Sequence, residues 1–435
     1  MRKKVVVLGA GYGGIFAAAN LCTSKIFDII LIDKNRYHLL LQQIPFVISG
    51  DKGRGDITIC LADLFRDEID EGFLSVLHAI IKDVDLMNKT IRLEQIGGAG
   101  KVLENLKYDY LIISLGAETH YFGIDGAQKH CLTFRSLEDT IKIRQKVESL
   151  PENSIVVVGG AGPSGVSLAA ALSELSTARE KELNVKVVDS AITILPGWDT
   201  RLAETSKKVL EAKGVQIMTG EKITTVTSDF VETESGKKIE SNCTIWTAGV
   251  KGYGINITPE VKRTNTGRII VDRYSRIPSS ENAFAIGDIS AFEITNSNID
   301  KTAITKDIAP QLAQFAVRQA RFVAENIERK ERGDELISIL TFSQRGHTIL
   351  LGKESLGILS GLLVTGRMCE YAEDSIVDNF IMEIKNKEKG ILAKALKASE
   401  NVESIEEFTL AFNFVTYATS KAFSDLLGYN NQYCR

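Results

Sequence analysis

The 435-residue chain has few of the residues that build metal sites or disulfide-linked folds, with only 6 cysteines and 5 histidines. The cysteines form no CxxC pair, so neither a zinc site nor a thioredoxin-like motif is indicated. They stand at positions 22, 60, 131, 243, 369 and 434. Scattered cysteines of this kind usually serve as small buried hydrophobic residues. We therefore expect no metal site.

Long hydrophobic runs and a basic excess are also missing. No run of about 18 apolar residues occurs, which argues against a transmembrane helix. Lys plus Arg number 52 against 56 Asp plus Glu, and this net charge of -4 argues against nucleic-acid binding. The opening MRKK passes directly into an apolar segment with glycines, so no signal peptide is predicted. The protein is expected to be made and kept in the cytoplasm.

The composition is otherwise that of an ordinary globular protein, long enough for about two to three domains, and it contains one duplicated motif. The two copies are VVVLGAGYGG at 5–14 and IVVVGGAGPSG at 155–165. Each copy has a β-branched run, then glycines, then an Ala-rich helical stretch. A further apolar strand follows each helix and ends in an acid, Asp33 or Asp189. This order predicts a βαβ unit that occurs twice.

The first copy has glycines at positions suited to a dinucleotide. Gly9 permits the tight turn after the strand, Gly11 lets a pyrophosphate approach the backbone, and Gly14 lets the helix pack closely. With Gly13 they complete a loop whose free N–H groups lie at the positive end of the helix. Asp33 follows about 20 residues beyond the loop, where a carboxylate accepts ribose hydroxyls.

The second copy repeats the arrangement with Gly160, Gly162 and Gly165, and with Asp189 as the acid. A carboxylate there repels a 2′-phosphate, which favours NADH over NADPH. The second helix is expected to be longer, so the acid falls later than usual, and an ordinary turn residue is the alternative for Asp189. Two dinucleotide units imply two dinucleotides, most economically a flavin in the first and a nicotinamide in the second.

A third motif, AIGD at 285–288, follows a predicted strand. Asp288 at such a turn can bind the ribityl chain of a flavin, although Gly-Asp is also a common turn pair. The hydrophobic pattern elsewhere predicts a helix over 56–68, a strand over 223–234, a long amphipathic helix over 306–329 and strands over 336–360.

Together these residues resemble the two-dinucleotide-binding-domain flavoprotein superfamily and, within it, the type II NADH dehydrogenases. Similar segments are YHLLLQQIPFVISG at 37–50, LIISLGAETHYFGIDG at 111–126, CLTFRSLEDTIKIR at 131–144 and TIWTAGVKG at 244–252. The most specific is AQFAVRQ at 313–319, which fits the family's AQxAxQ quinone-site pattern. The resemblance implies that Gln314 and Gln319 lie near the isoalloxazine and the quinone. Further cofactor contacts implied in the same way are Lys34, Gly116, Gly249 and Ala313.

The fold implied is α/β, with two Rossmann-like dinucleotide-binding domains of the flavoprotein disulfide-reductase type and a C-terminal α+β region. The expected FAD-binding domain comprises 1–118 and 253–330, and the NADH-binding domain comprises 119–252. The C-terminal region, 331–435, is expected to serve membrane association or dimerisation. The activity implied is hydride transfer from NADH to FAD, followed by two-electron transfer to a membrane quinone without proton pumping. Such a respiratory-chain enzyme binds peripherally at the cytoplasmic face of the membrane.

The chain also departs from the family. Ser167 stands two residues after the last glycine of the second motif, where the family usually carries Glu, and this puts its rate or proton handling in question. The stretch 408–429 fits either a membrane-interface segment or a dimer or core helix. By pattern alone, 313–319 equally fits a helix that packs closely through its alanines. His347 is a candidate flavin neighbour, with a hydrogen-bonded turn histidine as the alternative.

Three other functions remain open at this point. A sulfide:quinone oxidoreductase shares the fold but needs reactive cysteines beside the flavin, and only Cys131 and Cys369 are candidates. A protein acceptor such as a ferredoxin would leave no motif, whereas the missing CxxC argues against a thiol acceptor. A flavin-binding redox sensor would bind FAD tightly and turn over no quinone.

Overall fold

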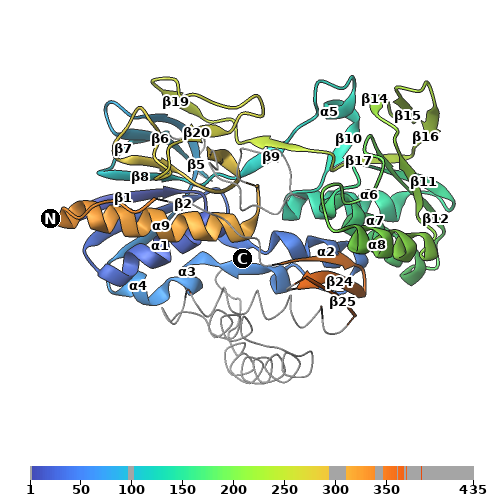
Figure 1. Ribbon diagram of the computed structural model, residues 1–435, viewed down its shortest axis with the longest axis horizontal. Helices are drawn as coiled ribbons and strands as arrows, with labels where there is room; N and C mark the ends of the chain where they lie inside the picture. The colour runs from blue at the N-terminus through green and yellow to red at the C-terminus, as the bar shows by residue number, and fades with distance from the viewer. Residues whose placement is uncertain are drawn as a thin grey trace.

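The computed structural model describes residues 2–96, 102–292, 310–338, 346–359 and 361–366, with Cys369 and Ile384. Two sheets rich in parallel strands, each packed against helices, lie side by side, and the expected α/β class with two Rossmann-like units is confirmed (Figure 1). No helix in the described ranges is long and apolar enough to span a bilayer. The predictions for 408–429 fall outside these ranges.

The first sheet is centred on β1 (Lys3–Leu8), the strand that precedes the first glycine loop. Its last residues are fully buried because strands flank it in the sheet, helices cover one face, and mainly residues of other strands cover the opposite face. The strand order is β21 (Ala283–Ala285), β8 (Tyr110–Ile113), β1, β2 (Phe27–Asp33), β5 (Leu74–Asp85), β6 (Thr90–Gln95) and β7 (Val102–Lys107). The helices α1 (Tyr12–Ser24) and α9 (Ala313–Arg332) pack together below β1 in Figure 1.

The second sheet is parallel throughout, and the second glycine loop follows its central strand. Its order is β10 (Cys131–Thr133), β17 (Cys243–Trp246), β11 (Ser154–Gly159), β12 (Leu183–Asp189) and β13 (Gln216–Thr219). Its helices are α6 (Leu137–Ser149), α7 (Pro163–Ala178) and α8 (Thr200–Ala212). The helix after the loop has 16 residues in α7 against 13 in α1, which confirms the expected longer spacing to the acid.

Two short strands carry the chain from one unit to the other and back. β9 (Ala117–Thr119) leaves the first sheet and pairs antiparallel with β18 (Val250–Gly252), on which the chain returns. An ion pair of 3.1 Å joins Lys251 to Glu118 across this ribbon. The ribbon therefore sets the relative position of the two glycine loops.

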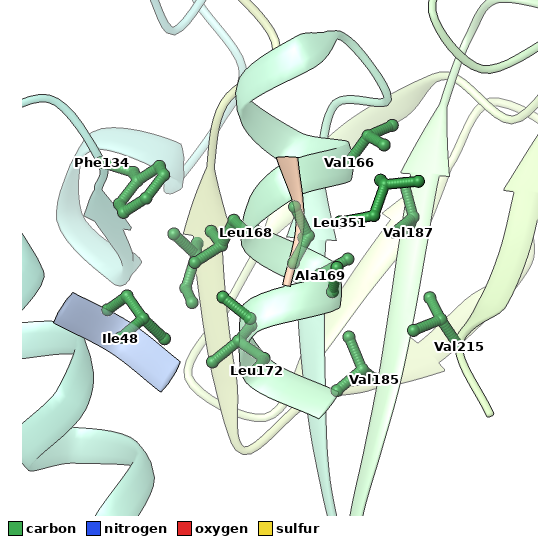
Figure 2. Close-up of a cluster of buried hydrophobic side chains, with 14 of the residues drawn as sticks. Ile48, Phe134, Val166, Leu168, Ala169, Leu172, Val185, Val187, Val215 and Leu351 are labelled. Atoms are coloured by element: carbon green, nitrogen blue, oxygen red, sulfur yellow. The ribbon is translucent and has the colours of Figure 1, made fainter. Parts of the chain in front are cut away.

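The core of the second unit draws side chains from distant parts of the chain. Ile48 of α2 (Ile44–Ser49) and Leu351 of β23 (Gly346–Leu351) belong to the same buried cluster as Leu168 and Leu172 of α7 (Figure 2). β23 pairs with β24 (Glu354–Leu359), which pairs with β25 (Leu362–Thr365). Helix α7 is thus covered by an N-terminal helix and by a C-terminal sheet.

Three predicted elements differ in detail. Residues 56–68 form β4 (Thr58–Cys60) and the short helices α3 (Leu61–Leu64) and α4 (Arg66–Asp70) instead of one helix, because β4 pairs with β3 (Tyr37–Leu39). The strand over 223–234 is a hairpin of β14 (Ile223–Val226) and β15 (Phe230–Thr233), since Thr227 and Phe230 bond to each other in a turn. The long helix runs over 313–332, and residues 306–309 of its predicted span lie outside the described ranges. Of the predicted strands over 336–360, β23 and β24 are present over 346–351 and 354–359, whereas 336–338 are not strand.

Candidate functional site

The first glycine loop is closed on its protein side and open on the other. Gly9 has φ +95°, and a Cβ atom there would lie 2.6 Å from the carbonyl oxygen of Ser114. A Cβ atom at Gly14 would overlap the carbonyl oxygen of Gly9, whereas one at Gly11 would meet no protein atom. Gly13 packs on the side chain of Ile286. This cradle at the N-terminus of α1 fits a pyrophosphate, which needs close approach to backbone N–H groups.

The second loop repeats this geometry closely. Gly160 has φ +116°, and a Cβ atom there would lie 2.6 Å from the Cα atom of Ala248. A Cβ atom at Gly165 would overlap the carbonyl oxygen of Gly160, while one at Gly162 would again meet nothing. Both loops therefore have the same shape, with the middle glycine facing open space at the start of a helix.

The acids that end β2 and β12 brace these loops. A carboxylate oxygen of Asp33 accepts from the N–H of Ala10 at 2.7 Å, and one of Asp189 accepts from the N–H of Ala161 at 2.6 Å. In each case the other oxygen accepts from the N–H two residues further along. Burial raises the pKa of Asp33, and the two N–H donors oppose that rise. Each carboxylate keeps spare lone pairs that suit ribose hydroxyls.

Two hydroxyls that the sequence analysis missed hold the loops from behind. Ser114 donates to the carbonyl oxygens of Leu8 and Gly9 at 2.8 and 2.9 Å. Thr247 is within hydrogen-bond distance of the carbonyl oxygens of Gly159 and Gly160, at 3.0 and 3.1 Å. The sequence carries a signal for them, since both strands beside a loop strand end in a hydroxyl residue, one residue and a glycine: Ser-Leu-Gly at 114–116 and Thr-Ala-Gly at 247–249.

Asp288 lies in the short helical turn Gly287–Ile289 and forms part of a charged group. Its carboxylate lies 3.9 Å from the guanidinium of Arg135, which comes from the loop before α6 in the second unit. Burial raises the pKa of Asp288, and the positive charges of Arg135 and Arg268 oppose that rise. Arg135 therefore joins the candidate flavin site from the other unit, a role that sequence reasoning missed.

The two glutamines assigned to the quinone-site pattern both lie on helix α9 but face different surroundings. Gln314 is half-buried near the start of the helix, and its amide donates to the carbonyl oxygen of Gly346 at 3.3 Å. Counted letter by letter, the sixth position of AQxAxQ is Arg318, and Gln319 is the seventh. Residues four apart share a helix face, so Arg318 follows Gln314 on one side while Gln319 points elsewhere.

Gln319 is fully buried behind the Asp288 turn. Its side-chain oxygen accepts from the N–H of Gly287 at 2.8 Å, and its amide nitrogen lies 3.2 Å from the hydroxyl of Ser290 and 3.3 Å from that of Ser275. Ala316, on the same helix, lies against Gly287. The helix thus supports the turn that carries Asp288.

The remaining predicted residues lie around these loops. Lys34 is exposed after Asp33, and Ala313 is exposed at the first position of α9. Gly116 has φ +71° and open space where a side chain would stand, whereas Gly249 lies against the ring of Phe122. His347 packs on Trp198 with ring centroids 4.3 Å apart, and Ser167 is buried within α7. Within the described ranges, no group of three or more metal-ligating side chains is found.

Three of the described cysteines, including both candidates for sulfide chemistry, are buried or half-buried. Burial raises the pKa of Cys131 to about 12 and that of Cys243 to about 11. Cys369 is fully buried. Because the thiolate is the reactive form, none of these three thiols suits sulfide chemistry in this conformation.

Comparisons with known proteins agree with this geometry. The "NADH dehydrogenase-like protein YutJ" of Bacillus subtilis is 27% identical over 84% of this chain and 95% of its own length. The "Type II NADH:quinone oxidoreductase" of Staphylococcus haemolyticus is 25% identical over 88% of this chain and 96% of its own. The resemblance to type II NADH dehydrogenases is thereby confirmed.

Solved structures share the fold at lower identity. NDH2 from Plasmodium falciparum in complex with NADH has a TM-score of 0.75 at 18% identity, covering 88% of this chain and 95% of that one. The sulfide:quinone oxidoreductase of Aquifex aeolicus has a TM-score of 0.74 at 17% identity, covering 92% and 96%. The profile of the pyridine nucleotide-disulphide oxidoreductases matches residues 3–320. With two matching nucleotide loops inside that span, the chain belongs to the pyridine nucleotide-disulphide oxidoreductase family.

Proposed function

We propose that the protein is an FAD-dependent NADH:quinone oxidoreductase of type II, which passes two electrons from NADH through FAD to a quinone without pumping protons. The observation that carries this proposal is the pair of open glycine loops, each braced by an acid, in a chain similar to proteins named for this activity. Bound FAD would supply the two-electron chemistry that amino-acid side chains lack.

The first loop is proposed to hold FAD. Gly9, Gly11, Gly13 and Gly14 shape the pyrophosphate cradle, and Asp33 accepts from the adenosine ribose. Lys34 and Gly116 complete the contacts to this half of the cofactor. Asp288 binds the ribityl chain, and Arg135 balances its charge from the second unit at 3.9 Å.

The second loop is proposed to hold NADH. Gly160, Gly162 and Gly165 receive its pyrophosphate on backbone N–H groups, with Gly249 at the nicotinamide end. Asp189 accepts from the ribose and repels a 2′-phosphate, so NADH is the preferred donor. Ser167, buried within α7, stands where the family usually carries Glu, so this chain has no carboxylate at that position.

The start of α9 is proposed to form the quinone side. Gln314 is partly exposed there and can hydrogen bond a quinone oxygen, with exposed Ala313 allowing close approach. We infer that Gln319 acts through the Gly287 turn as a positioning residue for Asp288, because its amide is buried and already hydrogen bonded. Ala313, Gln314 and Gln319 thus share one helix but serve different parts of the site.

The division into an FAD-binding domain (1–118 and 253–330), an NADH-binding domain (119–252) and a C-terminal region (331–435) remains our proposal. So do peripheral attachment to the cytoplasmic face of the membrane and homodimer formation. A lipid-soluble acceptor requires a membrane surface, and the C-terminal region, 331–435, is the proposed place of contact.

A steady-state assay with a short-chain quinone tests the proposal directly. Purified protein with FAD should reduce the quinone with NADH and much more slowly with NADPH. Flavin absorbance should bleach when NADH is added without air. A flavin that stays oxidised with NADH, or a preference for sulfide as donor, contradicts the proposal.

The sulfide:quinone alternative is tested by one substitution. Cys131→Ser should leave NADH oxidation unchanged, because burial keeps this thiol protonated at neutral pH. Sulfide-dependent quinone reduction that disappears in this variant would favour the alternative instead.

A further inference from the structure

An exposed aromatic ring lies against the nicotinamide-side loop of the second unit. Phe122 follows the crossover strand β9 and is 54% exposed, although most large hydrophobic side chains among the described residues are buried. A Cβ atom at Gly249 would lie 2.5 Å from the Cζ atom of Phe122. The ring therefore occupies the space beside Gly249 that a side chain would need.

The backbone holds Phe122 in a conformation that few residues adopt. Its φ is +51°, and Gly123 follows with φ +72°. The N–H of Ile124 donates to the carbonyl of Tyr121 at 2.9 Å, which closes a turn with two left-handed residues. Such turns favour Asn or Gly at the first of these positions, so a phenylalanine there is strained. Strain of this kind, at an exposed position beside a ligand loop, points to a functional constraint.

Neighbouring contacts tie the ring to the loop. The ring of His120 packs on Phe122 with centroids 4.1 Å apart, and the N–H of His120 donates to the carbonyl of Gly249 at 3.0 Å. The indole N–H of Trp246 donates to the carbonyl of His120 at 2.8 Å. Loop 247–249 begins at the carboxyl end of β17, the edge of a parallel sheet where nucleotides bind.

We propose that Phe122 is a positioning residue for NADH, whose ring fills the space at Gly249 and holds loop 247–249 in its binding position. This inference rests on the proposed function of the second loop. The ring acts through Gly249, and the positive φ keeps it there at the crossover between the two units. NADH binding therefore depends on a side chain outside the glycine motif.

The test measures NADH binding, apart from turnover, on the FAD-loaded protein by calorimetry under anaerobic conditions with NAD⁺ as the non-reacting probe. Phe122→Ala should weaken binding about fivefold to tenfold, while the FAD content stays unchanged. Phe122→Tyr, which keeps the ring, should bind as tightly as the wild type. Phe122→Gly relaxes the backbone but lacks the ring, so it should remain weak.

A pair of substitutions tests the contact itself. Gly249→Ala should weaken binding because its methyl group meets the Phe122 ring. In the double variant Phe122→Ala, Gly249→Ala that overlap is gone, so it should bind at least as tightly as Gly249→Ala alone. Phe230→Ala serves as the control, since it removes a ring from the same unit on the β15 hairpin.

The outcomes separate the two proposals. If the wild type binds no NAD⁺ and NADH leaves its flavin oxidised, the proposed function fails. If the wild type binds but Phe122→Ala changes only the melting temperature, the ring is merely structural and this inference fails. The inference would also fail if the loss of NAD⁺ affinity in the double variant equalled the product of the losses in the two single variants. Such independent effects would mean that Phe122 and Gly249 do not act through one contact.

Discussion

In the first nucleotide unit the carbonyl of Ala10 lies 2.9 Å from Nδ1 of the His38 ring, whereas in the second the equivalent carbonyl of Ala161 accepts from the backbone N–H of Leu195 at 2.8 Å. A carbonyl only accepts, so Nδ1 of His38 must carry the proton. The loops otherwise match in their glycines, acids and supporting hydroxyls. The equivalent loop carbonyl is thus hydrogen bonded by an ionisable side chain in the first unit and by a backbone N–H in the second.

The surroundings of the two units explain this difference. β3 brings a buried histidine beneath the first loop, and Tyr12 packs edge-on to its ring at 4.7 Å. The segment after β12 turns back sharply, with Leu195 at φ +49°, and so offers a backbone donor to the second loop. The two glycine loops therefore keep the same shape with different neighbouring segments, provided that each loop carbonyl has a hydrogen-bond donor.

The largest expected effects come from the glycines that the two units share. Gly14→Ala should yield protein without bound FAD, because the new methyl group overlaps the Gly9 carbonyl. Gly165→Ala should keep FAD but lower NADH oxidation by at least about 100-fold, since the loop must open to admit the methyl group. The ratio of flavin to protein absorbance and the NADH assay measure the two effects.

Gly162→Ala is the matched control, because its methyl group meets no protein atom. It should melt like the wild type and still bind NADH less tightly, since the pyrophosphate approaches there. A Gly165→Ala variant that loses FAD as well would break the assignment of one nucleotide to each loop.

The next largest effect distinguishes the loops by pH. Burial lowers the pKa of His38 to about 4, below its value in an unfolded chain. Between these two values the unfolded state binds more protons than the folded state, so stability falls as the pH drops. The free energy of unfolding should decrease by about 3 kcal/mol from pH 7 to below pH 4 on account of this group.

His38→Asn keeps a donor for Ala10 but removes the titration, so its unfolding free energy should depend less steeply on pH. Urea unfolding at several pH values and fixed FAD concentration measures the slope. His130→Asn, on the partly exposed helix α5 (Ala127–His130), is the control. If the unfolding free energy of His38→Asn depended on pH as steeply as that of the wild type, groups other than His38 would cause the loss of stability at low pH.

Donor preference should change more modestly, and only through the second unit. Asp189→Asn keeps an oxygen for the Ala161 N–H, loses the acceptor for the Ala191 N–H and removes the charge, so the NADH-to-NADPH ratio of kcat/KM should fall about tenfold. Asp33→Asn should weaken FAD retention and leave that ratio alone. A ratio that responds equally to both substitutions would contradict the assignment of one dinucleotide to each unit.

Much of this arrangement follows from local sequence. The order of strand, glycines, helix, strand and acid predicts both loops, since each step depends on neighbouring residues in the chain. Local patterns do not predict the contact between Arg135 and Asp288, because these residues come together only after folding. They also do not predict that Ile48 packs into the core of the other unit. Helix α9 shows the limit most clearly. One residue turns a helical side chain by about 100°, so Gln319 and Arg318 occupy different environments that a letter pattern does not separate.

The smallest expected effects come from the hydroxyls behind the loops, and they test the comparison most finely. Thr247→Val removes a donor worth about 1 kcal/mol, so KM for NADH should rise about fivefold while kcat and FAD content hold. Thr247→Ser should restore the wild-type KM. Ser114→Ala should speed FAD release and leave KM for NADH unchanged. Because neither hydroxyl is proposed to touch a cofactor, each acts only through its own loop. If either substitution disturbed both nucleotides equally, the hydroxyls would support the fold as a whole, and the two units would not be separable at this level.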